Sequence, residues 1–182
     1  MTNLRRWIVR LLVCLMVLIP LGVIGLYLAN PFGARSYDPR QRILGYSPYR
    51  VPSRSMAPTV SPGQIVIMSA GHYHKREPQR GDIVVFLAPH DGNAWIKRVV
   101  GLPGEAIAIK EGELFIDGEI VDEEYVAAAN EVTDYSQEMS MRKLGKDSYF
   151  LLGDNRDNSE DGRMMGSTKR DDIIGKVVVI LN

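Results

Sequence analysis

The sequence predicts a mostly β fold: a compact antiparallel β-sheet or barrel-like domain with one N-terminal transmembrane helix. Three observations carry this prediction. Short runs rich in β-branched residues recur from residue 64 onwards, acidic-glycine pairs separate some of them, and one long uncharged apolar stretch lies near the N-terminus. Val and Ile suit the half-buried surface of a strand, and a domain of about 130 residues can bury its own core.

The apolar stretch runs from Leu11 to Leu28, 18 residues without a charge. A helix of this length nearly crosses a hydrocarbon core of about 30 Å. A cleavable signal peptide is the alternative, but Tyr27 before Ala29 does not fit an A-x-A cleavage site. We therefore expect residues 1–29 to form an N-terminal segment with a single, retained transmembrane helix.

Residues 30–50 combine three prolines and two glycines with several arginines and tyrosines. This composition predicts an irregular juxtamembrane tether whose tyrosines and arginines rest on lipid headgroups. Residues 51–182 should then form the β-rich domain. The expected strands are the runs 64–68, 82–86, 95–100, 106–110, 113–116, 119–121, 149–152 and 173–181.

Two tight hairpins are expected inside this domain. Glu111-Gly112 and Asp117-Gly118 separate three of the runs, and such pairs between apolar segments are a strong hairpin signal. The only helical candidate after the apolar stretch is 123–130. The whole interval 120–146 is polar and is expected to be irregular.

Ser55 and Lys97 are the chemically most informative residues. Ser55 lies in VPSRSMAPTV, where two prolines bracket a short turn and Ser53 offers a second hydroxyl. Lys97 lies in AWIKRVVG, where alternation along a strand puts Lys97 on one face and Arg98 on the other, each among apolar residues. At least one of these faces should be covered. Burial lowers the pKa of a lysine toward the range of a general base.

Four segments, in order, resemble the type I signal peptidases, which are membrane-bound serine proteases with a Ser/Lys dyad. The segments are PSRSMAPT, RGDIVVF, WIKRVVGLPGE and LLGDNRDNSEDGR, and the similarity covers about residues 50–182. The resemblance implies that Ser55 is the nucleophile and Lys97 the general base. It further implies an oxyanion hole made by the Ser53 hydroxyl and the Ser55 backbone N–H, and a Ser159 hydroxyl that holds the lysine amine in place.

The same resemblance implies a supporting structure around the dyad. Two ion pairs are expected, Asp161 with Arg163 and Asp154 with Arg98. Apolar residues beside the dyad could form the pocket for small substrate side chains, with burial in the core as their alternative role. These pocket candidates are Met56 and Ile96.

Three positions depart from the family pattern. Arg54 stands where a glycine is usual between the two serines, and its charge could alter the turn, approach the substrate or help keep Lys97 neutral. Gln64 stands where an aspartate is common, and Gly162 replaces a serine common before Arg163. Neither of these last two touches the expected proton path.

The implied function is removal of N-terminal signal peptides from exported preproteins after small residues, at Ala-x-Ala type sites. Two alternatives remain open: a specialised relative that processes a single pilus or conjugation-type precursor, and a non-catalytic membrane-anchored β scaffold. The expected partners are membrane-anchored preproteins with signal peptides and the phospholipid membrane. Zero formal net charge gives no indication of a nucleic-acid partner.

Other chemistries receive less support from the residues. A Ser/His/Asp triad built on His72, His74 or His90, or a metal site at His72 and His74, competes with the simpler interpretation of solvated loop histidines. We expect no metal and no cofactor. Arginines are nearly balanced across the span, so the resemblance decides the location: a single-pass plasma (inner) membrane protein with a cytoplasmic N-terminus and an extracytoplasmic catalytic domain.

Overall fold

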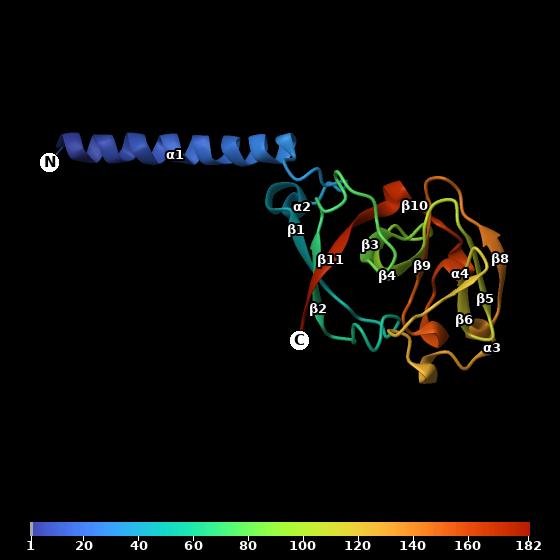
Figure 1. Ribbon diagram of the computed structural model, residues 1–182. Coiled ribbons are helices and arrows are strands. Elements are labelled where there is room, and N and C mark those ends of the chain that lie inside the picture. The colour runs from blue at the N-terminus through green and yellow to red at the C-terminus, as the bar shows by residue number, and fades with distance from the viewer. Residues whose placement is uncertain (1) are drawn as a thin grey trace.

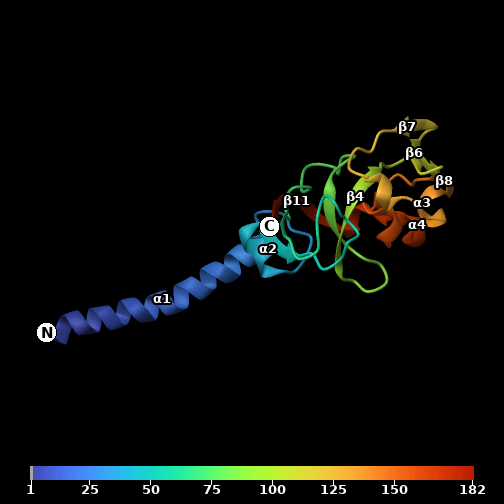
Figure 2. The same cartoon turned by 90° about the horizontal axis from the view of Figure 1, so that it is seen from below.

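The computed structural model describes residues 2–182 as an N-terminal helix followed by a β-rich domain (Figure 1). Helix α1 (Thr2–Ala29) contains the predicted apolar stretch, and it is long and apolar enough to cross a membrane. Figure 2 shows α1 projecting away from the domain, and its most apolar part is not buried against other parts of the described chain. Helix α1 is therefore a candidate membrane span.

The domain consists of two antiparallel sheets, a large curled sheet and a small one. The large sheet has the strand order β1-β2-β11-β3-β4-β9-β10. Its strands are β1 (Tyr46–Arg50), β2 (Ile65–Ser69), β3 (Ile83–Leu87), β4 (Ala94–Gly101), β9 (Ser148–Leu152), β10 (Thr168–Lys169) and β11 (Ile173–Leu181). The small sheet, in the order β7-β6-β5-β8, contains β5 (Ala106–Lys110), β6 (Glu113–Ile116), β7 (Glu119–Val121) and β8 (Met139–Lys143). The mostly β prediction is confirmed.

Both predicted hairpins lie in the small sheet. The loop residues Glu111 and Gly112, and likewise Asp117 and Gly118, all have positive φ angles. Two-residue loops with two positive φ angles match the twist of the flanking strands. The registers Lys110↔Glu113 and Ile116↔Glu119 place these pairs at the hairpin tips.

Part of the segment expected to be an irregular tether is ordered. Helix α2 (Pro39–Leu44) is capped by the Asp38 side chain and ends at Gly45 in the left-handed conformation. Strand β1 follows and pairs with β2, with Pro48 opposite Ile67. A proline is tolerated here because β1 is an edge strand. The division of the chain at residue 51 stays a prediction, but residues 46–50 belong to the large sheet.

The interval 120–146 is more structured than expected, and the helix predicted at 123–130 is wrong over most of its length. Only the 3₁₀ turn η1 (Ala128–Asn130) is helical there, followed by α3 (Asp134–Gln137) and by β8. Glu123 is instead bonded to the guanidinium of Arg156 at 2.7 Å, a tertiary contact that outweighs weak local helix propensity. The remaining short helices are η2 (Arg156–Asn158), α4 (Gly162–Met165) and η3 (Arg170–Asp172).

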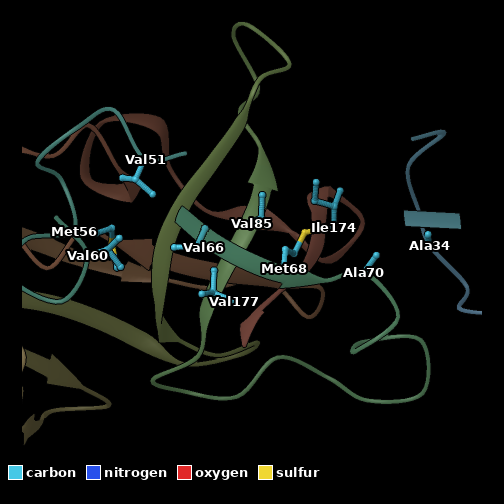
Figure 3. Packing of buried hydrophobic residues seen from close by; sticks show 10 residues of the cluster. All are labelled: Ala34, Val51, Met56, Val60, Val66, Met68, Ala70, Val85, Ile174 and Val177. Carbon is cyan, nitrogen blue, oxygen red and sulfur yellow. The ribbon is translucent and has the colours of Figure 1, made fainter. Parts of the chain in front are cut away.

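One core cluster anchors the turn that carries Ser55. Figure 3 shows Met56 and Val60 from this turn near Val66 of β2 and other buried residues of the cluster. Met56 is 1% exposed and Val60 is fully buried. Fully burying one such apolar side chain contributes roughly 1.5–3 kcal/mol to stability. These contacts therefore fix the turn that carries Ser55 to the core.

Candidate active site

Ser55 and Lys97 meet across the sheet although 42 residues separate them in the sequence. Lys97 Nζ donates a hydrogen bond to Ser55 Oγ at 3.0 Å, and a second to the Ile96 carbonyl at 3.2 Å. Strand β4 supplies the lysine, and the turn after β1 supplies the serine. A nucleophile within hydrogen-bond distance of a base is the geometry that activates a hydroxyl.

Lys97 lies in an environment that favours its neutral form. Lys97 is only 3% exposed, and this burial lowers the pKa of its side chain to about 8. The carboxylates of Asp161, Glu160 and Asp154 oppose this lowering, while the Arg163 guanidinium adds to it. At pH 7 roughly one Lys97 in ten is then neutral, whereas an unperturbed lysine is neutral about once in 3000 molecules.

Ser53 lies beside the proposed nucleophile. Its Oγ is 3.1 Å from Ser55 Oγ, so a second hydroxyl reaches the point where a substrate carbonyl would be attacked. Among residues 2–182, the Ser55 backbone N–H is bonded to no acceptor, and the Ser55 carbonyl accepts from the Asn155 N–H at 3.1 Å. The turn therefore presents the Ser55 N–H and the Ser53 hydroxyl close together beside Ser55 Oγ.

The two expected ion pairs are present and buried. Arg98 donates to both carboxylate oxygens of Asp154 at 2.8 and 2.6 Å, and Arg163 does the same to Asp161 at 2.9 and 2.8 Å. Asp161 also accepts from the Gly153 N–H at 3.0 Å and caps α4. Bidentate pairs of this kind fix geometry as well as charge. Together the two ion pairs hold the segment 153–163 next to Ser55 and Lys97.

Ser159 is close to the dyad but makes no hydrogen bond to Lys97. Its Oγ is buried and has no partner among the described residues. A Cβ built at Gly153 would lie 2.2 Å from Ser159 Oγ and 2.4 Å from the Ser55 carbonyl oxygen. Gly153 thus allows the backbone of the 153–163 segment to contact both serines directly, a requirement that sequence reasoning had not identified.

Two tyrosines that support the site were also missed. The Arg98 guanidinium lies 3.9 Å from the ring centroid of Tyr125, and that of Arg163 lies 4.1 Å from the centroid of Tyr135. The Tyr135 hydroxyl donates to the Ser159 carbonyl at 3.0 Å. Both tyrosines come from the interval expected to be irregular, and only their aromatic character in a polar segment could have indicated a buried contact.

A cleft of about 480 Å³ opens beside the dyad. Two extended stretches, 49–53 and 93–97, form its sides, and Met56 and Ile96 both line it. Met56 is at the same time part of the core, and Ile96 packs against that cluster. Glu160 also lines the cleft, which explains its effect on the lysine and identifies it as a residue absent from the predicted set.

The structure gives physical reasons for two of the three departures. A Cβ at Gly162 would lie 2.9 Å from the Leu151 carbonyl oxygen, so glycine suits the close packing on β9. Gln64 accepts from the Ser61 N–H at 2.7 Å and bonds Asn182 at 2.5 Å, which closes a turn without a carboxylate. Arg54 is exposed, and the cation that lowers the pKa of Lys97 is Arg163.

The three histidines lie in loops. His90 is in the β3–β4 connection, with its ring 5.0 Å from that of Trp95 in a T-shaped contact. His72 and His74 lie in the connection between β2 and β3. The hydrogen-bond partner of Ser55 is the lysine and not a histidine, so the geometry favours the Ser/Lys arrangement over a histidine triad.

Comparison with known proteins shows relatives of this chain among the signal peptidases. The chain is 36% identical over 135 residues to a probable signal peptidase I-2 of Synechocystis sp., covering 71% of this chain and 60% of that protein. It is 35% identical over 164 residues to a signal peptidase I of Leptolyngbya laminosa, covering 86% and 75%. The alignments thus span about three fifths to three quarters of these relatives.

A solved structure shows the same likeness in three dimensions. The crystal structure of a signal peptidase I from Enterococcus faecalis V583 aligns with a TM-score of 0.52 at 32% identity, covering 57% of this chain and 98% of that one. A family model described as "Signal peptidase, peptidase S26" matches residues 40–182. The matched residues include Ser55 and Lys97, which are hydrogen-bonded to each other. Because this match covers most of the sequence, the chain belongs to the signal peptidase, peptidase S26 family.

Proposed function

We propose that this protein is a signal peptidase I, an endopeptidase that removes N-terminal signal peptides from exported preproteins. The observation that carries the proposal is the buried hydrogen bond between Lys97 and Ser55 at the floor of an open cleft. The family membership and the identities to signal peptidases support the reaction class.

In the proposed mechanism, neutral Lys97 takes the proton of Ser55 as Oγ attacks the scissile carbonyl carbon. The carbonyl π electrons move to oxygen, and the Ser53 hydroxyl and the Ser55 N–H donate to the oxyanion. The intermediate collapses with cleavage of the C–N bond, and Lys97 returns its proton to the leaving amine. Water then attacks the acyl-serine with Lys97 again as base, which releases the signal peptide and restores Ser55.

Ser159 completes the arrangement in this proposal. A neutral lysine amine has two hydrogens and one lone pair. If two acceptors other than Ser55 bind the two hydrogens, the lone pair points at the serine hydroxyl. The Ile96 carbonyl is one such acceptor at 3.2 Å. The unpartnered, buried Ser159 Oγ is the candidate for the second, through a small rotation of either side chain when substrate excludes water.

The cleft suits an extended peptide with small side chains near the cut. Its two sides are the stretches that leave β1 and begin β4, and a substrate strand can lie between such extended segments. Met56 and Ile96 would bound the pockets and restrict them to residues such as Ala. Helix α1 would anchor the enzyme with its N-terminus in the cytoplasm and the catalytic domain outside, where membrane-bound preproteins reach it at high effective concentration.

Cleavage of a purified preprotein in uncharged detergent tests the proposal. Parent protein should cut after a small residue at an Ala-x-Ala type site, and Ser55→Ala and Lys97→Met should each lose cleavage while keeping the parent's circular dichroism spectrum. A panel of unrelated preproteins should all be cut. If folded parent protein cleaves one pilus-type precursor only, the specialised function is correct; if it cleaves none, the scaffold alternative is.

A further inference from the structure

A second cavity, of about 410 Å³, lies where the domain meets helix α1. We call it the basic pocket; residues 31–32, 45–46 and the loop 69–76 form its walls. Pro31 and Phe32 follow the last residue of α1, Ala29, by only two and three positions. If α1 spans the bilayer, as proposed above, the pocket lies at the depth of the lipid headgroups, which extend roughly 5–7 Å beyond each side of the hydrocarbon core.

The walls of the basic pocket pack closely against each other. A Cβ at Gly33 would lie 2.1 Å from the His74 ring, and one at Gly71 would lie 2.5 Å from the Phe32 carbonyl oxygen. The two loops therefore touch at positions where only glycine fits. The Asn30 side chain closes the adjoining turn through two hydrogen bonds to the backbone of Ala34, at 2.9 and 3.0 Å. These contacts join the 69–76 loop to the segment that directly follows α1.

Basic side chains line this pocket, namely His72, His74, Lys75 and Arg76, and no acidic residue is among its lining. None of the ion pairs in the described part of the chain involves these four residues. Lys75 and Arg76 are exposed. Two unpaired cations at the mouth of a preformed cavity create a local positive potential.

Two acidic residues that follow the pocket loop in the sequence, Glu77 and Asp82, are bonded to other cations. The Glu77 carboxylate accepts from Arg170 at 2.7 Å and from the Tyr149 hydroxyl at 3.0 Å. Asp82 accepts from Lys176 at 2.5 Å. The pKa of His72 is lowered mainly by burial, with smaller contributions from the charges of Lys176 and Arg76, while the charge of Asp82 opposes this lowering.

We propose that the basic pocket binds the phosphate group of an anionic phospholipid at the membrane surface. Lys75 and Arg76 would contact the phosphate, while Phe32 and Tyr46 would lie along the glycerol and upper acyl region, as aromatic residues do at membrane interfaces. Each cation near an anionic surface contributes about 1 kcal/mol. This site is separate from the catalytic cleft and supplies a second attachment that fixes the orientation of the domain on the membrane.

The test is a titration of the full chain in an uncharged maltoside detergent with dihexanoyl-phosphatidylglycerol, read out by native mass spectrometry. Dihexanoyl-phosphatidylcholine and inorganic phosphate form the other two arms. The parent should bind one phosphatidylglycerol saturably. The variant Lys75→Gln/Arg76→Gln should bind it about 30-fold more weakly, from two charges. The matched control Lys110→Gln/Lys146→Gln removes two exposed cations, one at the end of β5 and one between β8 and β9. Strands β5 and β8 lie on the side of the domain away from α1 (Figure 1), so this variant should bind like the parent.

Equal affinity of the parent and Lys75→Gln/Arg76→Gln would overturn the proposal, as would phosphatidylcholine binding as tightly as phosphatidylglycerol. Inorganic phosphate binding as tightly as the lipid would overturn the lipid assignment in favour of a free anion. The readout requires no cleavage and no bilayer. A chain that binds the lipid but cleaves no preprotein would contradict only the proposed peptidase function.

Discussion

Replacing Lys97 by methionine should stabilise the folded protein at neutral pH. The pKa of Lys97 is about 8 in the folded state against 10.5 ordinarily, so the unfolded chain binds the lysine proton more tightly. Below pH 8 folding therefore carries a penalty of about 3 kcal/mol, from roughly 2.5 pKa units at 1.36 kcal/mol each. Stability should rise with pH between 8 and 10.5 as the unfolded lysine also loses its proton. At pH 10 the same two pKa values leave a penalty of about 1 kcal/mol on folding.

Urea unfolding followed by far-UV circular dichroism, at pH 7 and pH 10 in uncharged detergent, measures this effect. The stability gained in Lys97→Met should shrink by about 2.5 kcal/mol between the two pH values, and packing differences between the side chains cancel in that comparison. Lys110→Met, at an exposed lysine, should show no such change. A gain that is the same at both pH values would refute the account of a desolvated lysine with a lowered pKa.

Three further predictions concern the neighbours of the dyad. Ser53→Ala should lower kcat about 10²- to 10³-fold through loss of one oxyanion donor, and an unchanged kcat would remove Ser53 from the mechanism. Gly153→Ala should fold, by circular dichroism, yet lose at least about 100-fold in activity, because its Cβ would displace the Ser55 backbone; a fully active variant would contradict that contact. Asp161→Asn should move the pH dependence of cleavage to lower pH, since the Asp161 charge raises the pKa of Lys97; an unmoved profile would show that this charge has no effect on the base.

Much of the sheet could be predicted because its strands are coded locally. The β-branched runs and the two acidic-glycine pairs correspond to strands β2 to β7, β9 and β11 and to the two tight hairpins. Strand β1 was missed because Pro48 reads as a breaker, whereas its position on the sheet edge leaves the missing N–H without consequence. An edge position is a tertiary property that no local pattern shows.

Alternation along β4 also predicted part of the site. Lys97 and Arg98 point to opposite faces, and both are buried, at 3% and 8% exposure. The expectation that at least one face is covered is met on both. Strand alternation alone could not show which cation has a carboxylate partner: Arg98 bonds Asp154, while Lys97 meets a serine hydroxyl.

The supporting contacts beyond the motifs could not be predicted. Tyr125 and Tyr135 lie in a polar interval and reach the arginines only because that interval folds over residues 153–163. Glu160 lines the cleft through the same arrangement. Such contacts depend on long-range packing, and the sequence around each residue carries no comparable signal. The role of Ser159 as a lysine partner stays a prediction.

The most direct test of the Ser55 and Lys97 dyad is the pH dependence of kcat/KM for preprotein cleavage, under conditions where the chemical step limits the rate. The account predicts a profile that rises with pH and reaches half its maximum near pH 8, since the lysine acts as base only when neutral. A flat profile from pH 6 to pH 10, or cleavage by Lys97→Met at the parent rate, would contradict lysine as the general base.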